Sequence, residues 1–206
     1  MTAGGWMRVR HMAWGWGSVG LAYAWAACWP LQGLRLGETA IDRVIAFDPQ
    51  GVWIYLSFFL LVPAAFLCGD ARRLPGLCRS MQMCAAVAAI AFVAYPTTLS
   101  YPAVTGSGWS DTMLRFVMAH DSPRNCLPSL HAALTVLSVL CLCEARRPAR
   151  SMAIAAWGLL ILHAIVQTRR HLAWDVSAGL LLGMASARWA QGSRPLRALT
   201  GGAAWR

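Results

Sequence analysis

The stretch VWIYLSFFLLVPAAFLC, residues 52–68, contains 17 residues and no charged side chain. The hydrocarbon core of a bilayer is about 30 Å thick, and a helix crosses it with roughly 17–25 mostly apolar residues. This stretch, Val52–Cys68, therefore predicts a membrane-spanning helix, and the chain on either side repeats the pattern.

Further apolar stretches of 14 to 19 residues flank it, covering Met12–Trp29, Met81–Leu99, Leu130–Cys143, Ser151–Gln167 and Leu172–Trp189. The first is diluted by glycines, which membrane helices tolerate where their backbones pack closely. No internal repeat or low-complexity linker divides the sequence. We expect an all-α, polytopic membrane protein with six transmembrane helices, forming a single membrane domain over residues 1–206.

The composition excludes other classes of protein. Hydrophobic residues make up 58% of the 206 residues and charged residues only 13%, whereas soluble proteins carry about 25% charged residues. A disordered chain would have far fewer apolar side chains.

The net charge of +10 rests on 18 arginines and no lysine. They lie in short clusters between apolar runs, which favours anionic lipid head groups over nucleic acid as their partners. The seven cysteines show no metal-binding spacing, so we expect neither a metal nor a cofactor.

The arginines also indicate the orientation. With six spans, 12 of the 18 arginines fall on the side that holds both termini, namely Arg8, Arg10, Arg72, Arg73, Arg79, Arg146, Arg147, Arg150, Arg188, Arg194, Arg197 and Arg206. Because basic residues concentrate on the cytoplasmic side, we expect both termini in the cytoplasm. An alternative interpretation makes residues 1–28 a cleaved signal peptide ending at Ala26-Ala27-Cys28, although Trp25 stands where a small aliphatic residue is usual.

Two histidines are predicted to meet at the outer surface. His131 and His171 are separated by 40 positions, and two membrane crossings of roughly 20 residues each return a chain to its starting side. Asp175 follows His171 by four positions, so on a helix the two side chains share a face and can hydrogen-bond. A carboxylate on one imidazole nitrogen fixes the tautomer and leaves the other nitrogen as a nucleophile.

Neighbouring polar residues suit a phosphate group. Ser129 lies where a helix begins, and the N–H groups of a helix N-terminus favour an anion. Arg124, Arg169 and Arg170 can each donate two hydrogen bonds to phosphate oxygens, and Asn125 adjoins Arg124. The sequence therefore predicts a phosphoryl-transfer site without a metal.

Structural roles stay open for several of these residues. Asp175 can complement the dipole at the start of the sixth span, and Arg169 and Arg170 can reach outward to lipid head groups. Three further residues are expected outside the site: His163 as a structural histidine in the fifth span, and His120 and Asp121 in a solvated loop.

The motifs Pro128-Ser129-Leu130-His131 and Thr168-Arg169-Arg170-His171, the second followed by Asp175 and Val176–Gly179, resemble those of the type-2 phosphatidic acid phosphatase superfamily. Within it, the pattern is most similar to the branch of inositol-phosphorylceramide synthases and their bacterial relatives. The resemblance covers about residues 95–183, the expected catalytic core. It implies a six-helix membrane fold, no metal requirement, and a site at the outer leaflet, here the periplasmic face of a bacterial inner membrane.

The resemblance also implies residue roles. His171 would be the nucleophile that becomes phosphohistidine, with Asp175 as the carboxylate that orients it. His131 would protonate the leaving oxygen, and Ser129 would hydrogen-bond the phosphoryl oxygens.

Two departures from the family pattern concern the phosphate. Ile165 stands where classical members have an arginine, and the upstream segment Tyr95–Pro102 has no cation. Stabilisation of the phosphate would then fall to Arg124, Arg169 or Arg170.

We therefore expect a membrane phosphatase that acts on lipid phosphate esters through a phosphohistidine. One alternative is a phosphotransferase that passes the phospho-head group to an alcohol instead of water. Two others are a lipid transporter or binder without enzymatic activity, and a divalent-metal site formed by His131, His171 and Asp175.

Overall fold

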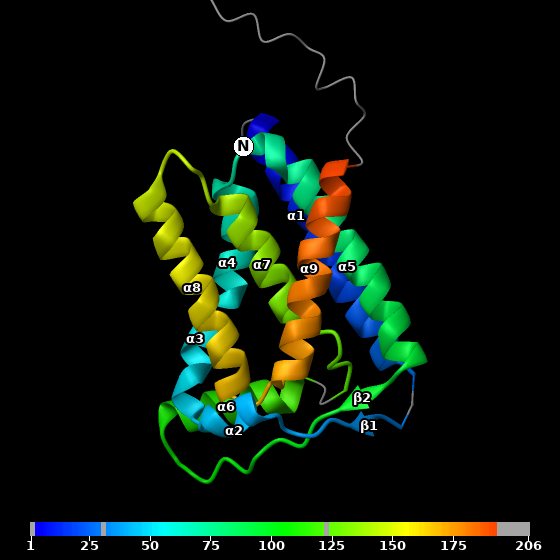
Figure 1. Cartoon of the computed structure of the whole chain (residues 1–206), viewed down its shortest axis with the longest axis vertical. Coiled ribbons are helices and arrows are strands. Elements are labelled where there is room, and N and C mark those ends of the chain that lie inside the picture. The colour runs from blue at the N-terminus through cyan, green and yellow to red at the C-terminus, as the bar shows by residue number, and fades with distance from the viewer. Residues whose placement is uncertain (1–2, 30–31, 122–123, 193–206) are drawn as a thin grey trace, which may run out of the picture.

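The computed structural model describes residues 3–29, 32–121 and 124–192, which fold mostly into helices (Figure 1). The helices are α1 (Ala3–Ala27), α2 (Ala40–Val44), α3 (Val52–Leu56), α4 (Phe58–Cys68), α5 (Leu74–Ala94), α6 (Trp109–His120), α7 (Leu130–Leu142), α8 (Pro148–Gln167) and α9 (Ala173–Gly192). Two short strands, β1 (Leu34–Arg35) and β2 (Thr97–Thr98), pair in parallel, and 3-10 turns cover Pro49–Gly51 and Ala71–Arg73. The tail arginines Arg194, Arg197 and Arg206 lie outside the described residues.

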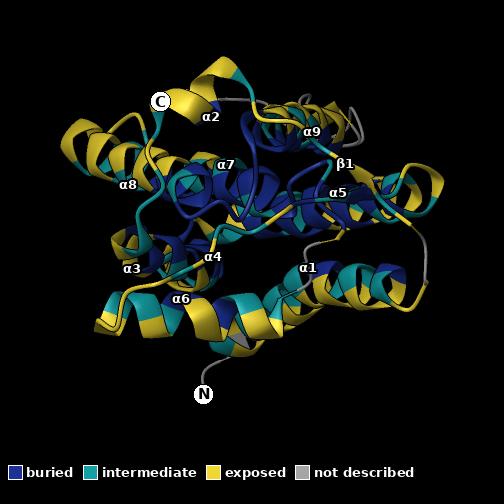
Figure 2. Cartoon of the chain, turned by 90° about the horizontal axis from the view of Figure 1, so that it is seen from below, coloured by how far each residue is buried: buried dark blue, intermediate teal, exposed yellow. Residues whose placement is uncertain are grey.

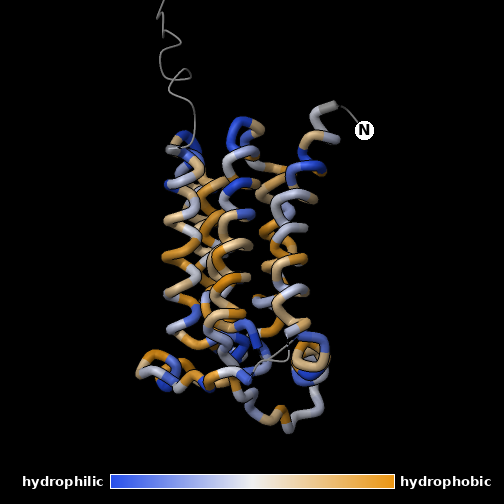
Figure 3. The backbone as a smooth tube through the Cα atoms, turned by 90° about the vertical axis from the view of Figure 1, so that its right-hand side faces the viewer, coloured by the Kyte–Doolittle hydropathy of each residue, from blue (hydrophilic) through white to orange (hydrophobic). Residues whose placement is uncertain are grey.

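The longer helices run side by side along the longest axis of the molecule, and α2, α6 and the strands lie across one end of the bundle (Figure 1). Hydrophobic residues dominate the middle of the bundle, and hydrophilic residues gather toward its ends (Figure 3). This distribution is typical of helices whose middle sections lie in lipid. Seen along the bundle, the buried residues concentrate on α4, α5 and α7, whereas α1, α6 and α8 form the outside (Figure 2).

Three helical stretches in the described part of the chain are long and apolar enough to cross a membrane: Pro49–Cys68, Ala71–Ala94 and Pro148–Gln167. The helix α7 is apolar but has only 13 residues. The mostly helical fold is therefore confirmed, and it contains three candidate membrane-spanning helices. Six spans and the position of the termini stay predictions.

The third predicted stretch was placed too late in the chain. We expected Met81–Leu99, whereas α5 covers Leu74–Ala94. Pro75 occupies the first turn of α5, where its missing N–H costs nothing. Pro96 disfavours helical geometry at the preceding residue, and Tyr95 accordingly leaves the helix at φ −139°.

The helix α6, which we did not predict, lies across the end of the bundle (Figure 1). Its buried residues are Leu114 and Val117, whereas Trp109 and Phe116 on the opposite side are exposed. An apolar exposed side on a helix in this position suits the boundary between lipid and water.

Small residues bring α7 and α9 close together. A Cβ atom on Gly179 would collide with the backbone carbonyl of Ser129, and one on Gly183 would lie 2.8 Å from the carbonyl oxygen of Ala133. Close helix contacts through glycine are a usual packing mode in membranes. Here they align the first turns of α7 and α9, which carry the residues of the predicted site.

Candidate active site

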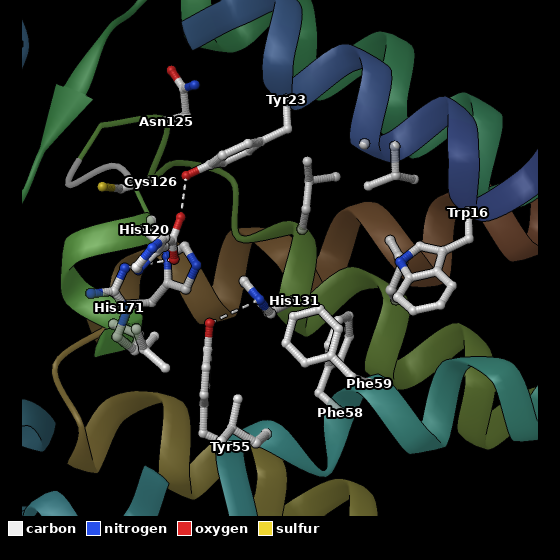
Figure 4. Close-up of a pocket in the computed structure, with 18 of the residues that line it drawn as sticks. Trp16, Tyr23, Tyr55, Phe58, Phe59, His120, Asn125, Cys126, His131 and His171 are labelled. Atoms are coloured by element: carbon white, nitrogen blue, oxygen red, sulfur yellow. Dashed lines mark hydrogen bonds and ion pairs between the residues drawn. The ribbon is translucent and has the colours of Figure 1, made fainter. Parts of the chain in front are cut away.

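The structure brings His131 and His171 together, with ring centroids 5.6 Å apart (Figure 4). His131 lies in the first turn of α7, and His171 lies in the turn that precedes α9. Ser129 links the two helix starts, because its N–H donates to the carbonyl of Asp175 at 3.0 Å while its hydroxyl oxygen accepts from the N–H of Ala132 at 3.2 Å.

Asp175 lies against His171, as the four-residue spacing predicted. Its Oδ2 atom is 3.4 Å from Nδ1 of His171 and accepts a hydrogen bond from the N–H of Leu172 at 3.0 Å. The Asp175 side chain is fully buried. A buried carboxylate at Nδ1 favours a proton on that nitrogen, which leaves Nε2 of His171 with its lone pair.

Arg170 supplies positive charge at the same place. Its Nη2 atom donates to Oδ2 of Asp121 at 2.6 Å, and its guanidinium carbon lies 4.2 Å from the ring centroid of Tyr101. The Nε and Nη1 atoms of Arg170 are buried and have no hydrogen-bond partner among the described residues. A buried donor without a partner is costly, so these atoms mark a place for an acceptor such as a phosphate oxygen.

Asp121 is not part of a solvated loop, which corrects our expectation. Besides its ion pair with Arg170, it accepts a hydrogen bond from the hydroxyl of Tyr23 on α1 at 2.6 Å. Burial raises the pKa of the Asp121 carboxyl, but the charge of Arg170, the neighbouring His131 and the hydrogen bonds from Tyr23 and Arg170 together outweigh this effect and hold the pKa below its usual value. The carboxylate therefore stays charged at neutral pH and fixes one side of the Arg170 guanidinium.

These groups face a cavity of about 400 Å³. Its polar end is formed by His131, His171, Arg170, Asp121, Arg124 and Asn125. Its apolar wall includes Trp16, Val19, Phe58, Phe59, Phe116 and Leu134. The cavity thus joins a charged end to an aromatic and aliphatic one, which suits a ligand that has a polar head and an apolar body.

The loop before α7 contributes Arg124 and Asn125. Arg124 is exposed and forms an antiparallel bridge with Thr98 next to the cavity. Asn125 is buried at φ 63°, a conformation that asparagine tolerates better than most residues. Its Nδ2 atom has no hydrogen-bond partner within the described chain, but the amide points away from the two imidazoles (Figure 4).

Two predicted phosphate-binding residues do not line the cavity. Ser129 is fully buried as the N-cap of α7. Arg169 adopts φ 55°, and its guanidinium donates to the carbonyls of Asp42 and Ile45 at 2.8 and 2.9 Å and pairs with Glu38 at 3.3 Å. Arg169 therefore holds the α2 segment against the turn before α9.

Two further histidines, His163 and His120, take other positions. His163 is exposed on the outside of α8 and does not line the cavity. His120 lines the cavity, and its Nδ1 atom lies 2.8 Å from the carbonyl oxygen of Phe116. The part of the chain that the structure describes contains no group of three or more His, Cys, Asp or Glu residues able to hold a metal ion.

Sequence reasoning missed Tyr23, Tyr55 and Asp121. The hydroxyl of Tyr55 lies 3.3 Å from Nε2 of His131, although the two residues are 76 positions apart (Figure 4). A tyrosine in an apolar helix carries no local signal for such a contact. Asp121 lies a few residues before the motif Pro128–His131, but its ion pair with Arg170 depends on how the loop between them folds.

Comparisons of the chain with models of protein families, with characterised proteins and with solved structures found no match.

Proposed function

We propose that this chain is a metal-independent membrane phosphatase that hydrolyses a lipid phosphate ester through a phosphohistidine at His171. One observation carries the proposal: Arg170, whose buried Nε and Nη1 atoms have no hydrogen-bond partner among the described residues, lines the same cavity as the two imidazoles. The resemblance of both motifs to the type-2 phosphatidic acid phosphatases supports it. Under this proposal the chain forms one six-span domain of a bacterial inner membrane, with cytoplasmic termini and a periplasmic site.

The first step forms the phosphohistidine. The lone pair on Nε2 of His171 attacks phosphorus while the bond from phosphorus to the alcohol oxygen breaks, and His131 gives a proton to that oxygen. Asp175 stabilises the positive charge that develops on the His171 ring. Arg170 donates to the equatorial oxygens, where charge collects in the transition state.

The second step restores the enzyme. A water oxygen attacks phosphorus, the bond from phosphorus to Nε2 breaks, and His131 takes the proton of the water. The products are an alcohol and inorganic phosphate. The lipid assignment follows from the apolar wall of the cavity, which can accept an acyl chain next to the charged end.

That wall also favours a second candidate, a phosphotransferase. A cavity lined by Trp16, Phe58, Phe59 and Phe116 can exclude water and accept an alcohol, and water exclusion determines which acceptor reaches the intermediate. The chemistry at His171 is the same for the phosphatase and the phosphotransferase. The two functions differ only in the acceptor of the phosphoryl group, which is water in the first and an alcohol in the second.

The test is turnover of radiolabelled lipid phosphates by the purified protein, with and without alcohol acceptors, by the wild type and two variants. His171→Gln should lose at least about 10³-fold in kcat, because a nucleophile has no substitute. His163→Gln is the matched control, because His163 is exposed on α8 away from the cavity, and it should keep full activity. Rapid alkaline quenching should trap an acid-labile phosphoprotein in the wild type and in His163→Gln but not in His171→Gln. A fully active His171→Gln variant would refute the proposal, and label appearing in an alcohol product would replace the phosphatase with the transferase.

A further inference from the structure

Tyr55 is the residue next to His131 that the proposed mechanism has not used. It lies on α3, only 2% of it is exposed, and its hydroxyl is 3.3 Å from Nε2 of His131. The two ring centroids are 5.3 Å apart, and the ring of Phe58 lies 4.8 Å from that of His131 on the next helix. The rings of Tyr55 and Phe58 pack against the His131 imidazole. Within the described chain, the side-chain group that hydrogen-bonds to a nitrogen of this imidazole is the Tyr55 hydroxyl.

A histidine that transfers protons has to present one ring nitrogen to the substrate. The other nitrogen needs a partner in both protonation states, since an unpaired polar atom inside the protein is costly. A hydroxyl oxygen accepts from Nε2–H in the imidazolium and also in the neutral ring that has lost its Nδ1 proton. On His171 it is the opposite nitrogen, Nδ1, that lies near a polar side chain, because Oδ2 of Asp175 is 3.4 Å from it.

We infer that Tyr55 is a positioning residue for His131: its hydroxyl engages Nε2 and so makes Nδ1 the nitrogen that exchanges a proton with the substrate oxygen. This inference rests on the proposed function and adds a residue outside the two motifs that suggested it. In the first step Nδ1–H gives its proton to the leaving oxygen, and in the second Nδ1 takes a proton from water. Nε2 keeps its proton, and Tyr55 neither gains nor loses one.

Other ionisable groups also act on His131. His171 faces it across the cavity, and the charges of Asp121 and Arg170 act on it from the loop before α7 and the turn before α9. Each of these groups influences the charge of His131 at a distance. A substitution of Tyr55 by Phe removes the hydroxyl from His131 and from the neighbouring Arg170 guanidinium, and it leaves the ionisable groups of His171, Asp121 and Arg170 themselves in place.

The experiment compares the wild type with Tyr55→Phe, which removes one oxygen and keeps the buried ring. We expect kcat to fall about 10- to 100-fold while KM changes little, because proton transfer by a positioned group contributes 10²–10⁴-fold. The alkaline limb of the kcat profile should move to lower pH, since the imidazolium loses its acceptor. Tyr95→Phe is the matched control, because Tyr95 is 53% exposed at the end of α5, and it should match the wild type.

A second measurement does not depend on turnover. In protein labelled with 15N-histidine, the His131 signals, assigned by their loss in His131→Gln, should show the neutral ring protonated on Nε2 in the wild type and a mixture of tautomers in Tyr55→Phe. A wild-type ring protonated on Nδ1 would overturn the inference. An unchanged kcat and pH profile in Tyr55→Phe would also overturn it, while leaving the phosphatase proposal intact. If the wild type turns over no phosphate ester, the proposed function fails, and the catalytic role of Tyr55 fails with it.

Discussion

Asp42 caps the helix that follows His171: its Oδ1 atom accepts a hydrogen bond from the N–H of Ala173, 131 positions later, at 2.8 Å. Ala173 is the first residue of α9, so this N–H has no partner within its own helix. The other carboxylate oxygen of Asp42 accepts from the N–H of Thr39 at 2.7 Å. Asp42 is fully buried, and it ties the α2 segment to the turn that presents Arg170 and His171.

Asp42→Ala should therefore destabilise the protein by about 1–3 kcal/mol, because it leaves a buried N–H without an acceptor. The measurement is the free energy of unfolding in mixed detergent micelles, together with kcat, which should also fall as the turn before α9 loosens. Asp48→Ala is the control: Asp48 caps only the short turn at residues 49–51, and its loss should cost less than about 1 kcal/mol. Equal effects of the two substitutions would contradict a special role for Asp42.

Gly179 sets the distance between α7 and α9. Gly179→Ala places a methyl group against the Ser129 carbonyl, and such overpacking costs about 1–3 kcal/mol. The variant should also lose activity, because the start of α7 carries His131 and the start of α9 follows His171. Gly76→Ala on α5 has open space around its Cβ position and should instead stabilise the protein by about 0.4–1 kcal/mol. Thermal unfolding of both variants checks the pair, and a harmless Gly179→Ala would show that the helices can separate without consequence.

The parts of this fold that could be predicted from the sequence are those that depend on the local pattern of apolar residues. Apolar runs predicted the six longer helical segments, although the one at α7 is shorter than a membrane crossing, and the spacing of 40 positions placed His131 near His171. The end of α5 was misjudged because Pro96 was given less weight than the hydrophobicity that continues past it. The helix α6 was missed because its apolar residues follow helical spacing over only 12 residues.

The partners within the site depend on the tertiary structure. Tyr23 and Tyr55 reach the cavity through the rotation of α1 and α3 about their axes, which no local pattern determines. Arg169 and Arg170 are adjacent and chemically identical, so sequence reasoning gave them the same role. The positive φ of Arg169 turns the chain there, and the two side chains reach different partners.

The ion pair between Arg170 and Asp121 predicts a pH dependence of stability. The folded-state pKa of Asp121 lies below its ordinary value, so the pair stabilises the folded state at pH values above about 4, the pKa of an unfolded aspartate. This contribution is lost as the pH falls through the folded-state pKa. Asp121→Asn should therefore be less stable than the wild type by about 1–3 kcal/mol at pH 7, and the difference should shrink below about pH 4.

Melting curves of both proteins at pH 7 and pH 3 measure this effect. Glu38→Gln is the control, because Glu38 is 49% exposed in its pair with Arg169, and exposed pairs contribute less than about 1 kcal/mol. A difference between the wild type and Asp121→Asn that stays constant between the two pH values would contradict the ionic origin of the contact.

The adjacent arginines give the sharpest separation of a structural role from a role in phosphate binding. Arg169→Gln removes donors from the carbonyls of Asp42, Ile45 and Val166, so it should cost about 2–4 kcal/mol of stability. In protein that remains folded, kcat/KM should change less than about tenfold, because Arg169 does not reach the cavity. Arg170→Gln should instead lower kcat/KM by at least about 100-fold, as expected for a donor to the phosphoryl oxygens. It should also abolish the protection against thermal unfolding that vanadate, a mimic of the five-coordinate phosphoryl group, gives the wild type. If vanadate protection survives in Arg170→Gln and disappears in folded Arg169→Gln, then Arg169 binds the phosphate and Arg170 has the structural role.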